Sequence, residues 1–183
     1  MNIIEKLLSF EDVDTLKAIK GKKLDYIRHN PMDDSGTILQ VVEFAIGECR
    51  YYLYCDLETM DYFGLDEDIS YISFSAEKYP FVDDCNLIEN HIGLKVTGVS
   101  EVKDDIQLYD DEELEYDFSF TRGIIIHFGD YQLSIEKVSY FSELMTVRKG
   151  YDLISKFESI EEYRKDFDDE CRIEVSRTVE QVC

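Results

Sequence analysis

The sequence predicts an α+β fold made mainly of antiparallel β-sheet, as one sheet or a two-sheet sandwich, with short helices near both ends. Runs of β-branched and aromatic residues are joined by Gly-acid pairs at Gly47-Glu48 and Gly129-Asp130, which is typical of β-hairpins. Helical spacing of apolar residues in the stretch 2–20 and a capping box at Ser159-Ile-Glu-Glu predict the short helices near the two ends. With 183 residues, of which 44% are hydrophobic, the chain has the size of a single domain with a substantial core.

The stretch 2–20 is predicted to form two short helices that break near Ser9, because Ser9-Phe-Glu-Asp resembles a capping box. Gly21 is expected to end the second helix. From Lys22 the period changes to two, which indicates strands. The strands expected after the first one cover residues 37–46, 49–55 and 69–75. The acidic stretches 56–68 and 101–117 are predicted to be loops, and 81–90 a connecting segment or short helix.

The second half is built around a hairpin that begins at Gly123 and turns at Gly129-Asp130. Ile125 lies between Ile124 and Ile126, so this strand is apolar on both faces and is predicted to be internal in a sheet. A further strand is expected over 140–148. Ser159-Ile-Glu-Glu predicts a helix start, with the helix running to about Phe167. Alternating Cys171, Ile173 and Val175 predict a closing strand.

The two halves, 21–80 and 93–151, share a spacing of glycine, lysine and apolar residues. Phe44-Ala-Ile-Gly-Glu-Cys corresponds to Ile126-His-Phe-Gly-Asp-Tyr, and Gly21-Lys-Lys-Leu to Gly93-Leu-Lys-Val. This similarity suggests an internal duplication of a strand-plus-hairpin unit. Gly-acid hairpins also recur by chance, so independent halves stay the alternative.

The charge of the chain is strongly negative. Lys and Arg number 19 and Asp and Glu 41, which gives a net charge of −22. Nucleic-acid phosphates and anionic lipids are bound by basic surfaces, so neither is expected as a direct ligand. A basic protein partner is the natural complement. Solubility alone would also account for an acidic surface.

Cellular location follows from three further observations. No apolar run approaches the roughly 20 residues that span a bilayer, and Glu5, Glu11 and Asp12 argue against a secretory signal. The five cysteines include no Cys-x-x-Cys pair. We therefore expect a cytoplasmic protein with reduced thiols, most of them in the core and Cys183 exposed.

No cofactor, metal or catalytic motif is recognised. His29, His91 and His127 lack metal-ligand spacing, and there is no nucleophile elbow, phosphate loop or dinucleotide fingerprint. An EF-hand would need glycine as its sixth residue, where loops starting at Asp56 and Asp104 carry other residues. The alternative is an enzyme whose carboxylate or cysteine site is not marked by a recognisable motif.

The acidic stretches 56–68 and 101–117 are interleaved with aromatic residues. Interfaces gain most of their energy from a few buried aromatics, while charges at the rim set association rate and specificity. Phe63 and Leu108 are expected to point into the core. The predicted partner-binding residues are Asp61, Tyr62, Asp66, Glu67, Asp68, Asp104, Asp105, Tyr109, Asp110, Asp111, Glu112 and Glu113.

The function predicted from these features is that of an acidic inhibitor which masks a basic protein. Nucleases keep a basic cleft for phosphates, and carboxylates can occupy it in their place. An immunity protein that neutralises a nuclease-type bacterial toxin is the first choice. A phage-type inhibitor of a defence nuclease uses the same physics, and a scaffold or oligomerisation module is a further alternative.

Overall fold

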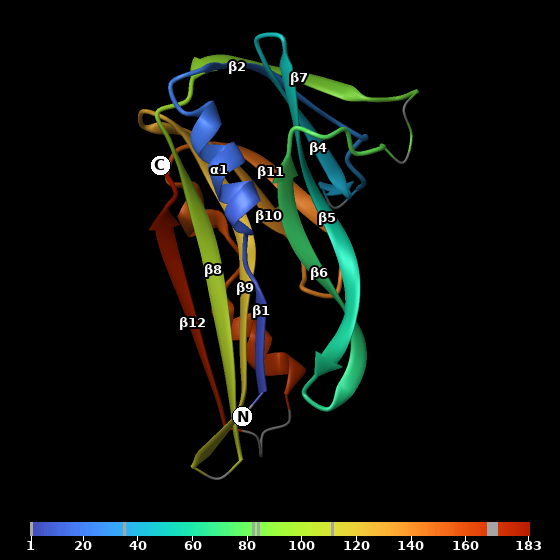
Figure 1. The fold of residues 1–183 in the computed structure, drawn as a ribbon, viewed down its shortest axis with the longest axis vertical. Helices are drawn as coiled ribbons and strands as arrows, with labels where there is room; N and C mark the ends of the chain where they lie inside the picture. The colour runs from blue at the N-terminus through green and yellow to red at the C-terminus, as the bar shows by residue number, and fades with distance from the viewer. Residues whose placement is uncertain (1, 35, 82, 84, 111, 168–171) are drawn as a thin grey trace.

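In the computed structural model, two β-sheets pack face to face (Figure 1). The structure describes residues 2–34, 36–81, 83, 85–110, 112–167 and 172–183. The five-stranded sheet has the order β6-β5-β4-β2-β7. Its strands are β2 (Lys23–His29), β4 (Val41–Ile46), β5 (Cys49–Tyr62), β6 (Leu65–Ser75) and β7 (Ile88–Lys95).

The seven-stranded sheet has the order β12-β8-β9-β10-β11-β3, and β1 pairs in parallel with β9 while all other pairs are antiparallel. Its strands are β1 (Asn2–Lys6), β3 (Thr37–Leu39), β8 (Gly98–Asp110), β9 (Glu113–Phe128), β10 (Tyr131–Lys137), β11 (Leu144–Gly150) and β12 (Arg172–Gln181). The helical elements are α1 (Phe10–Ile19) and two 3-10 helices, η1 (Leu153–Lys156) and η2 (Ile160–Asp166). The prediction of a mainly antiparallel β fold with short helices is confirmed.

The two sheets repeat one strand order, β7-β2-β4-β5-β6 in one and β12-β8-β9-β10-β11 in the other. In each, a meander is followed by a later strand that returns to pair with the first strand of the meander. The Gly47-Glu48 and Gly129-Asp130 turns occupy corresponding places, between β4 and β5 and between β9 and β10. A shared topology does not establish a shared origin, so the duplication stays a prediction.

Residues 120–126 of strand β9 are buried on both faces, as the sequence predicts. Ile124 and Ile126 lie in the core shared by the two sheets, and Ile125 packs on the opposite face against Val102 and Phe157. The strand lies between β8 and β10. A strand covered on both faces cannot alternate apolar with polar residues, which explains the continuous isoleucine run.

The prediction of a helix before Ser9 is wrong, whereas the helix start at Ser9 is confirmed. Residues 2–6 form β1, which pairs with Tyr116–Phe120 of β9. Strand β10 pairs only with residues 123–128, so the rest of that edge of β9 is left for β1. Ser9 caps α1 in a capping box with Asp12, and Gly21 follows the helix with φ +80°.

The acidic stretches 56–68 and 101–117 are not loops. The first belongs to the β5–β6 hairpin, which turns at Phe63-Gly64 with φ values of +51° and +86°. The second belongs to the β8–β9 hairpin. High charge density suggests a loop, but the two strands of each hairpin are hydrogen-bonded to each other, and near the tips most of their side chains are exposed or half-buried.

Two expected elements have a different form in the structure. The segment 37–46 is two strands in different sheets, because the chain turns at Gln40 with φ +64°. The helix at 160–166 is 3-10 rather than α. Its N-cap is Ser159, whose side chain accepts a hydrogen bond from the Glu161 amide. The helix start was therefore predicted correctly, and only the type of helix differs.

The remaining elements differ from expectation in their bounds. The described part of 81–90 contains no helix, and β7 begins at Ile88. The strand expected over 140–148 is β11, which begins at Leu144, and the closing strand is confirmed as β12. In the described ranges, no helix has the length and apolar character needed to cross a membrane.

Candidate partner-binding surface

The two acidic hairpins lie at the same end of the molecule and touch each other (Figure 1). The rings of Phe63 and Tyr116 have centroids 4.9 Å apart, and the Tyr116 hydroxyl donates to Asp61 Oδ1 at 3.4 Å. Phe63 also packs edge-on against Phe167 at 5.2 Å. We call the surface formed by the tips of these hairpins, residues 58–68 and 107–117, the acidic end.

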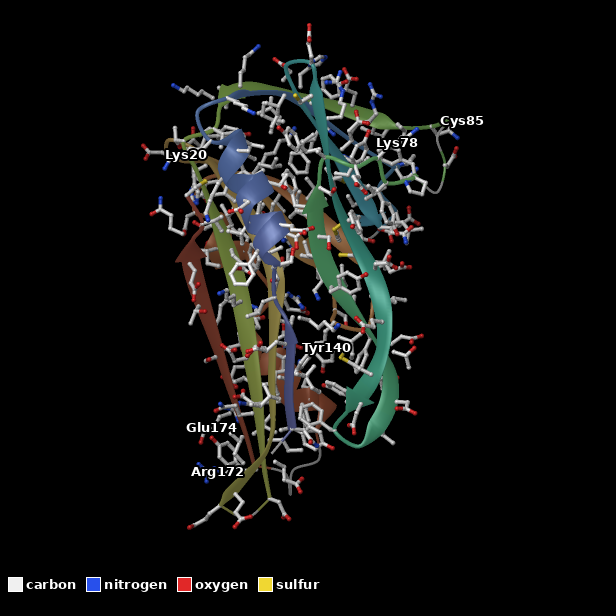
Figure 2. All side chains as sticks on the ribbon, viewed as in Figure 1. Lys20, Lys78, Cys85, Tyr140, Arg172 and Glu174 are labelled. Atoms are coloured by element: carbon white, nitrogen blue, oxygen red, sulfur yellow. The ribbon has the colours of Figure 1, made fainter. Side chains whose placement is uncertain are left out.

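The acidic end carries exposed carboxylates that are not neutralised. Among the described residues, those without an ion pair are Asp61, Asp66, Glu67, Asp68, Asp110, Glu112, Glu113 and Glu115. Two cations that lie beside the hairpins already have partners. Lys6 is paired with Glu58 at 2.5 Å, and Arg172 with Glu174 at 2.6 Å. In Figure 2, Arg172 and Glu174 lie at this end, whereas Lys20 and Lys78 lie toward the other.

The strand registers place like charges directly opposite each other at both tips. Asp61 faces Asp66 across the β5–β6 pair, and Asp110 faces Glu113 across the β8–β9 pair. Directly opposed like charges destabilise an antiparallel sheet. The acidic end therefore concentrates negative charge at some cost in stability.

One hollow is lined by carboxylates of the acidic end, and a second by other carboxylates of the seven-stranded sheet. One, of about 470 Å³, is lined by Thr59, Asp66, Glu67, Asp68 and the half-exposed ring of Phe141. Carboxylates beside an aromatic ring suit a Lys or Arg side chain, which can form ion pairs and stack on the ring. The other, of about 360 Å³, is lined on β8, β9 and β12 by residues that include Asp105, Asp117 and Glu174.

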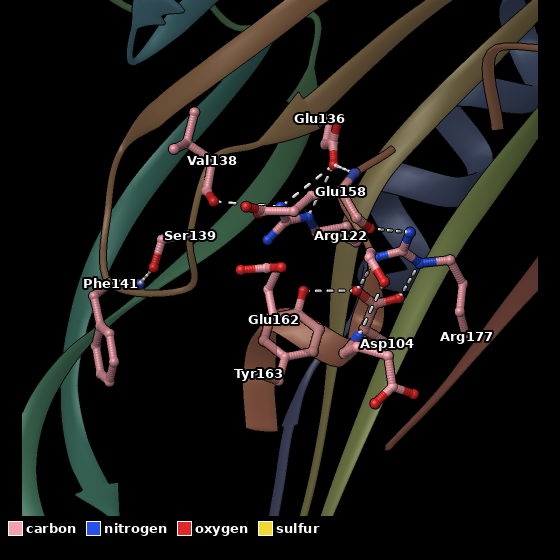
Figure 3. Close-up of polar contacts among 12 residues, drawn as sticks. Asp104, Arg122, Glu136, Val138, Ser139, Phe141, Glu158, Glu162, Tyr163 and Arg177 are labelled. Carbon is pink, nitrogen blue, oxygen red and sulfur yellow. Dashed lines mark hydrogen bonds and ion pairs between the residues drawn. The ribbon is translucent and has the colours of Figure 1, made fainter. Parts of the chain in front are cut away.

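Two of the predicted contact residues are buried and do not belong to this surface. Asp104 is fully buried, where it pairs with Arg177 at 2.6 Å and accepts from the Tyr163 hydroxyl at 2.7 Å (Figure 3). Tyr62 packs in an aromatic core, and its hydroxyl lies 2.7 Å from that of Tyr140. Their sequence neighbours are exposed or half-buried, so charge and spacing alone could not single out these two.

The other predicted contact residues differ in burial and in the contacts that they make. Tyr109 is half-buried beneath the guanidinium of Arg172, which lies 4.4 Å from the ring centroid. Asp105 is half-buried and accepts from the Ser119 hydroxyl at 2.5 Å. Asp111 lies outside the described residues. Phe141 was missed, because it comes from the β10–β11 connection and no sequence signal joins it to the acidic hairpins.

The cysteines and histidines show no reactive arrangement in the described ranges. Of the cysteines described, only Cys55 is buried, and burial raises the pKa of its thiol to about 12, which disfavours the thiolate. Cys49 and Cys85 are exposed and Cys183 is half-buried, so the expectation that most thiols lie in the core is wrong. Burial also lowers the pKa of His127, whose Nε2 lies 2.8 Å from the Ser100 hydroxyl. Within the same ranges, no three His, Cys, Asp or Glu side chains meet as a metal site.

No protein-family model, curated protein or solved structure matches this chain. The geometry and charge of the acidic end are therefore the features from which a function can be inferred.

Proposed function

We propose that the acidic end binds and masks a basic protein. The observation that supports this most directly is the pair of hairpin tips at which Asp61 faces Asp66 and Asp110 faces Glu113 without a cation paired to them in the described part of the chain. A basic partner would relieve this repulsion on binding, because its Lys and Arg side chains would lie between the carboxylates.

The partner class that best fits is a nuclease-type toxin, which would make the chain an immunity protein. A nuclease holds phosphates with Lys and Arg, and carboxylates spaced along two hairpins can occupy the same donors. Phe141 and the half-buried Tyr109 would supply apolar contact beside the charges. An inhibitor of a defence nuclease would use the same surface.

The test is affinity capture from the native host with two baits of equal net charge. The first bait carries Asp66→Asn, Asp110→Asn and Glu113→Gln at the acidic end. The matched control carries Glu48→Gln, Glu77→Gln and Asp130→Asn, which are exposed residues outside both hairpin tips. We expect wild type and control to capture the same basic protein, and the first bait to lose it.

Association kinetics with the captured protein then test the mechanism. The association rate should fall steeply as salt is added, because electrostatic steering is screened. The first bait should melt no lower than wild type, since its substitutions remove like-charge repulsion. A salt-insensitive rate, or equal capture by all baits, would refute masking by the acidic end.

A further inference from the structure

A cavity on the seven-stranded sheet has the opposite charge character to the acidic end. Its volume is about 260 Å³, and among its described lining residues basic side chains outnumber acidic ones. The charged residues of the lining are Arg122, Glu136, Lys137, Arg148, Lys156 and Glu158. They come from β9, β10, β11 and the segment that starts with η1, so neither acidic hairpin tip contributes.

The position of Arg122 in the cavity lining is set by an irregularity in the seven-stranded sheet. A β-bulge between β8 and β9 leaves Arg122 without a register partner on β8, and its side chain is 1% exposed. Its Nη2 donates to Glu158 Oε2 at 2.6 Å, and its Nε lies 3.3 Å from Glu136 Oε1 (Figure 3). Its Nη1 has no hydrogen-bond partner among the described residues. A buried guanidinium nitrogen without an acceptor is costly, so this arrangement is incomplete as it stands.

Two further cations of the lining, Arg148 and Lys156, have hydrogen-bond donors that could bind an anion. Arg148 uses Nη1 to reach Glu136 Oε2 at 2.5 Å, and its side chain is 33% exposed. Lys156 is exposed, and no ion pair of its ammonium is found in the described part of the chain. The buried Lys137 is already committed, since its Nζ donates to the Ser70 carbonyl oxygen at 2.6 Å. Without Lys137, the cations Arg122, Arg148 and Lys156 still outnumber the carboxylates Glu136 and Glu158.

We propose that this cavity binds a small oxyanion of the phosphate class through Arg122, Arg148 and Lys156. Guanidinium groups pair with phosphate oxygens in a planar, directional way, and an ammonium adds a point charge. The volume accommodates a phosphate together with several waters, each of which takes roughly 30 Å³. Glu158 is half-exposed, so its carboxylate can turn into solvent and leave room for the anion beside Arg122 Nη2. This nitrogen would keep its longer contacts to Glu136 Oε1 and the Val138 carbonyl oxygen, each at 3.3 Å.

Calorimetric titration with inorganic phosphate tests the site, with sodium chloride at equal ionic strength as the reference. We expect saturable binding to wild type. Lys156→Gln should weaken it by about tenfold, because a charge-assisted hydrogen bond is lost. Glu158→Gln should tighten it by about threefold, since a competing carboxylate is removed. Lys165→Gln is the matched control, because Lys165 is exposed, pairs with Glu162 and does not line the cavity.

Phosphate affinity is expected to fall in Lys156→Gln and to rise in Glu158→Gln, so one of the two variants still tests the site if the other folds poorly. Weaker binding in Lys156→Gln or tighter binding in Glu158→Gln, with the control unchanged, supports the site. Absence of saturable binding to wild type overturns the proposal. Equal affinity in all variants also overturns it, because phosphate would then bind elsewhere.

Discussion

The buried ammonium of Lys137 gives a quantitative prediction about stability and pH. Its side chain is fully buried, its Nζ donates to the Ser70 carbonyl oxygen, and it lies 5.0 Å from the centroid of the Phe120 ring. Burial, with a smaller contribution from the nearby Arg122 charge, lowers the pKa of Lys137 from 10.5 to about 8.

The lowered pKa makes the protonated amine a cost to the folded state. The difference of 10.5 − 8 = 2.5 pKa units corresponds to about 3 kcal/mol, at about 1.4 kcal/mol per unit. Between pH 8 and pH 10.5 the Lys137 amine is protonated more fully in the unfolded chain than in the folded one. The contribution of Lys137 to the free energy of unfolding therefore rises with pH across this window. Below pH 8 both states are protonated and the full cost is present.

Urea unfolding of wild type and Lys137→Met, followed by circular dichroism from about pH 7 to pH 10.5, measures this effect. We expect the free energy of unfolding of wild type, minus that of the variant, to rise by about 3 kcal/mol across the window. Taking the difference cancels the titration of tyrosines and other lysines. Lys78→Met at an exposed position serves as the control and should show no such rise. A flat difference for Lys137→Met would refute the reasoning.

Three further predictions concern residues that hold the two sheets and α1 in place. Gly123→Ala should lower the free energy of unfolding by about 3 kcal/mol in denaturant titration, because the new Cβ would lie 2.3 Å from a carbonyl oxygen of β10. Asp104→Asn should cost about 3 kcal/mol and lower the melting temperature, since it leaves Arg177 without its buried counterion; an unchanged melting temperature would contradict this role. Asp12→Ala should cost about 2 kcal/mol and speed amide exchange at Phe74, because Asp12 completes the capping box of α1 and accepts from the Phe74 amide at 2.7 Å.

Local sequence patterns predicted those parts of the fold that depend on near neighbours. The isoleucine run in β9 and the capping box at Ser9 follow from periodicity and hydrogen bonding within a few residues. The placement of β1 does not, because it depends on an open edge of β9, a strand far away in the chain.

The candidate site, too, was predictable only where it depends on near neighbours in the sequence. Composition located the acidic stretches, but only the fold brings Asp61 beside Tyr116. Charge density could not separate the buried Asp104 from the exposed Asp110, since the difference depends on Arg177 from a distant strand. The basic cavity was not predicted at all, because its cations are scattered among three strands and a 3-10 helix.

Because Arg177 lies on β12, the chain can complete its seven-stranded sheet only late in synthesis. Strand β12 follows every other described strand, and it supplies the counterion for Asp104 on β8. While β12 is still inside the exit tunnel, a natively folded β8 would bury the Asp104 carboxylate without its Arg177 counterion. We therefore expect the seven-stranded sheet to close only after translation has passed β12.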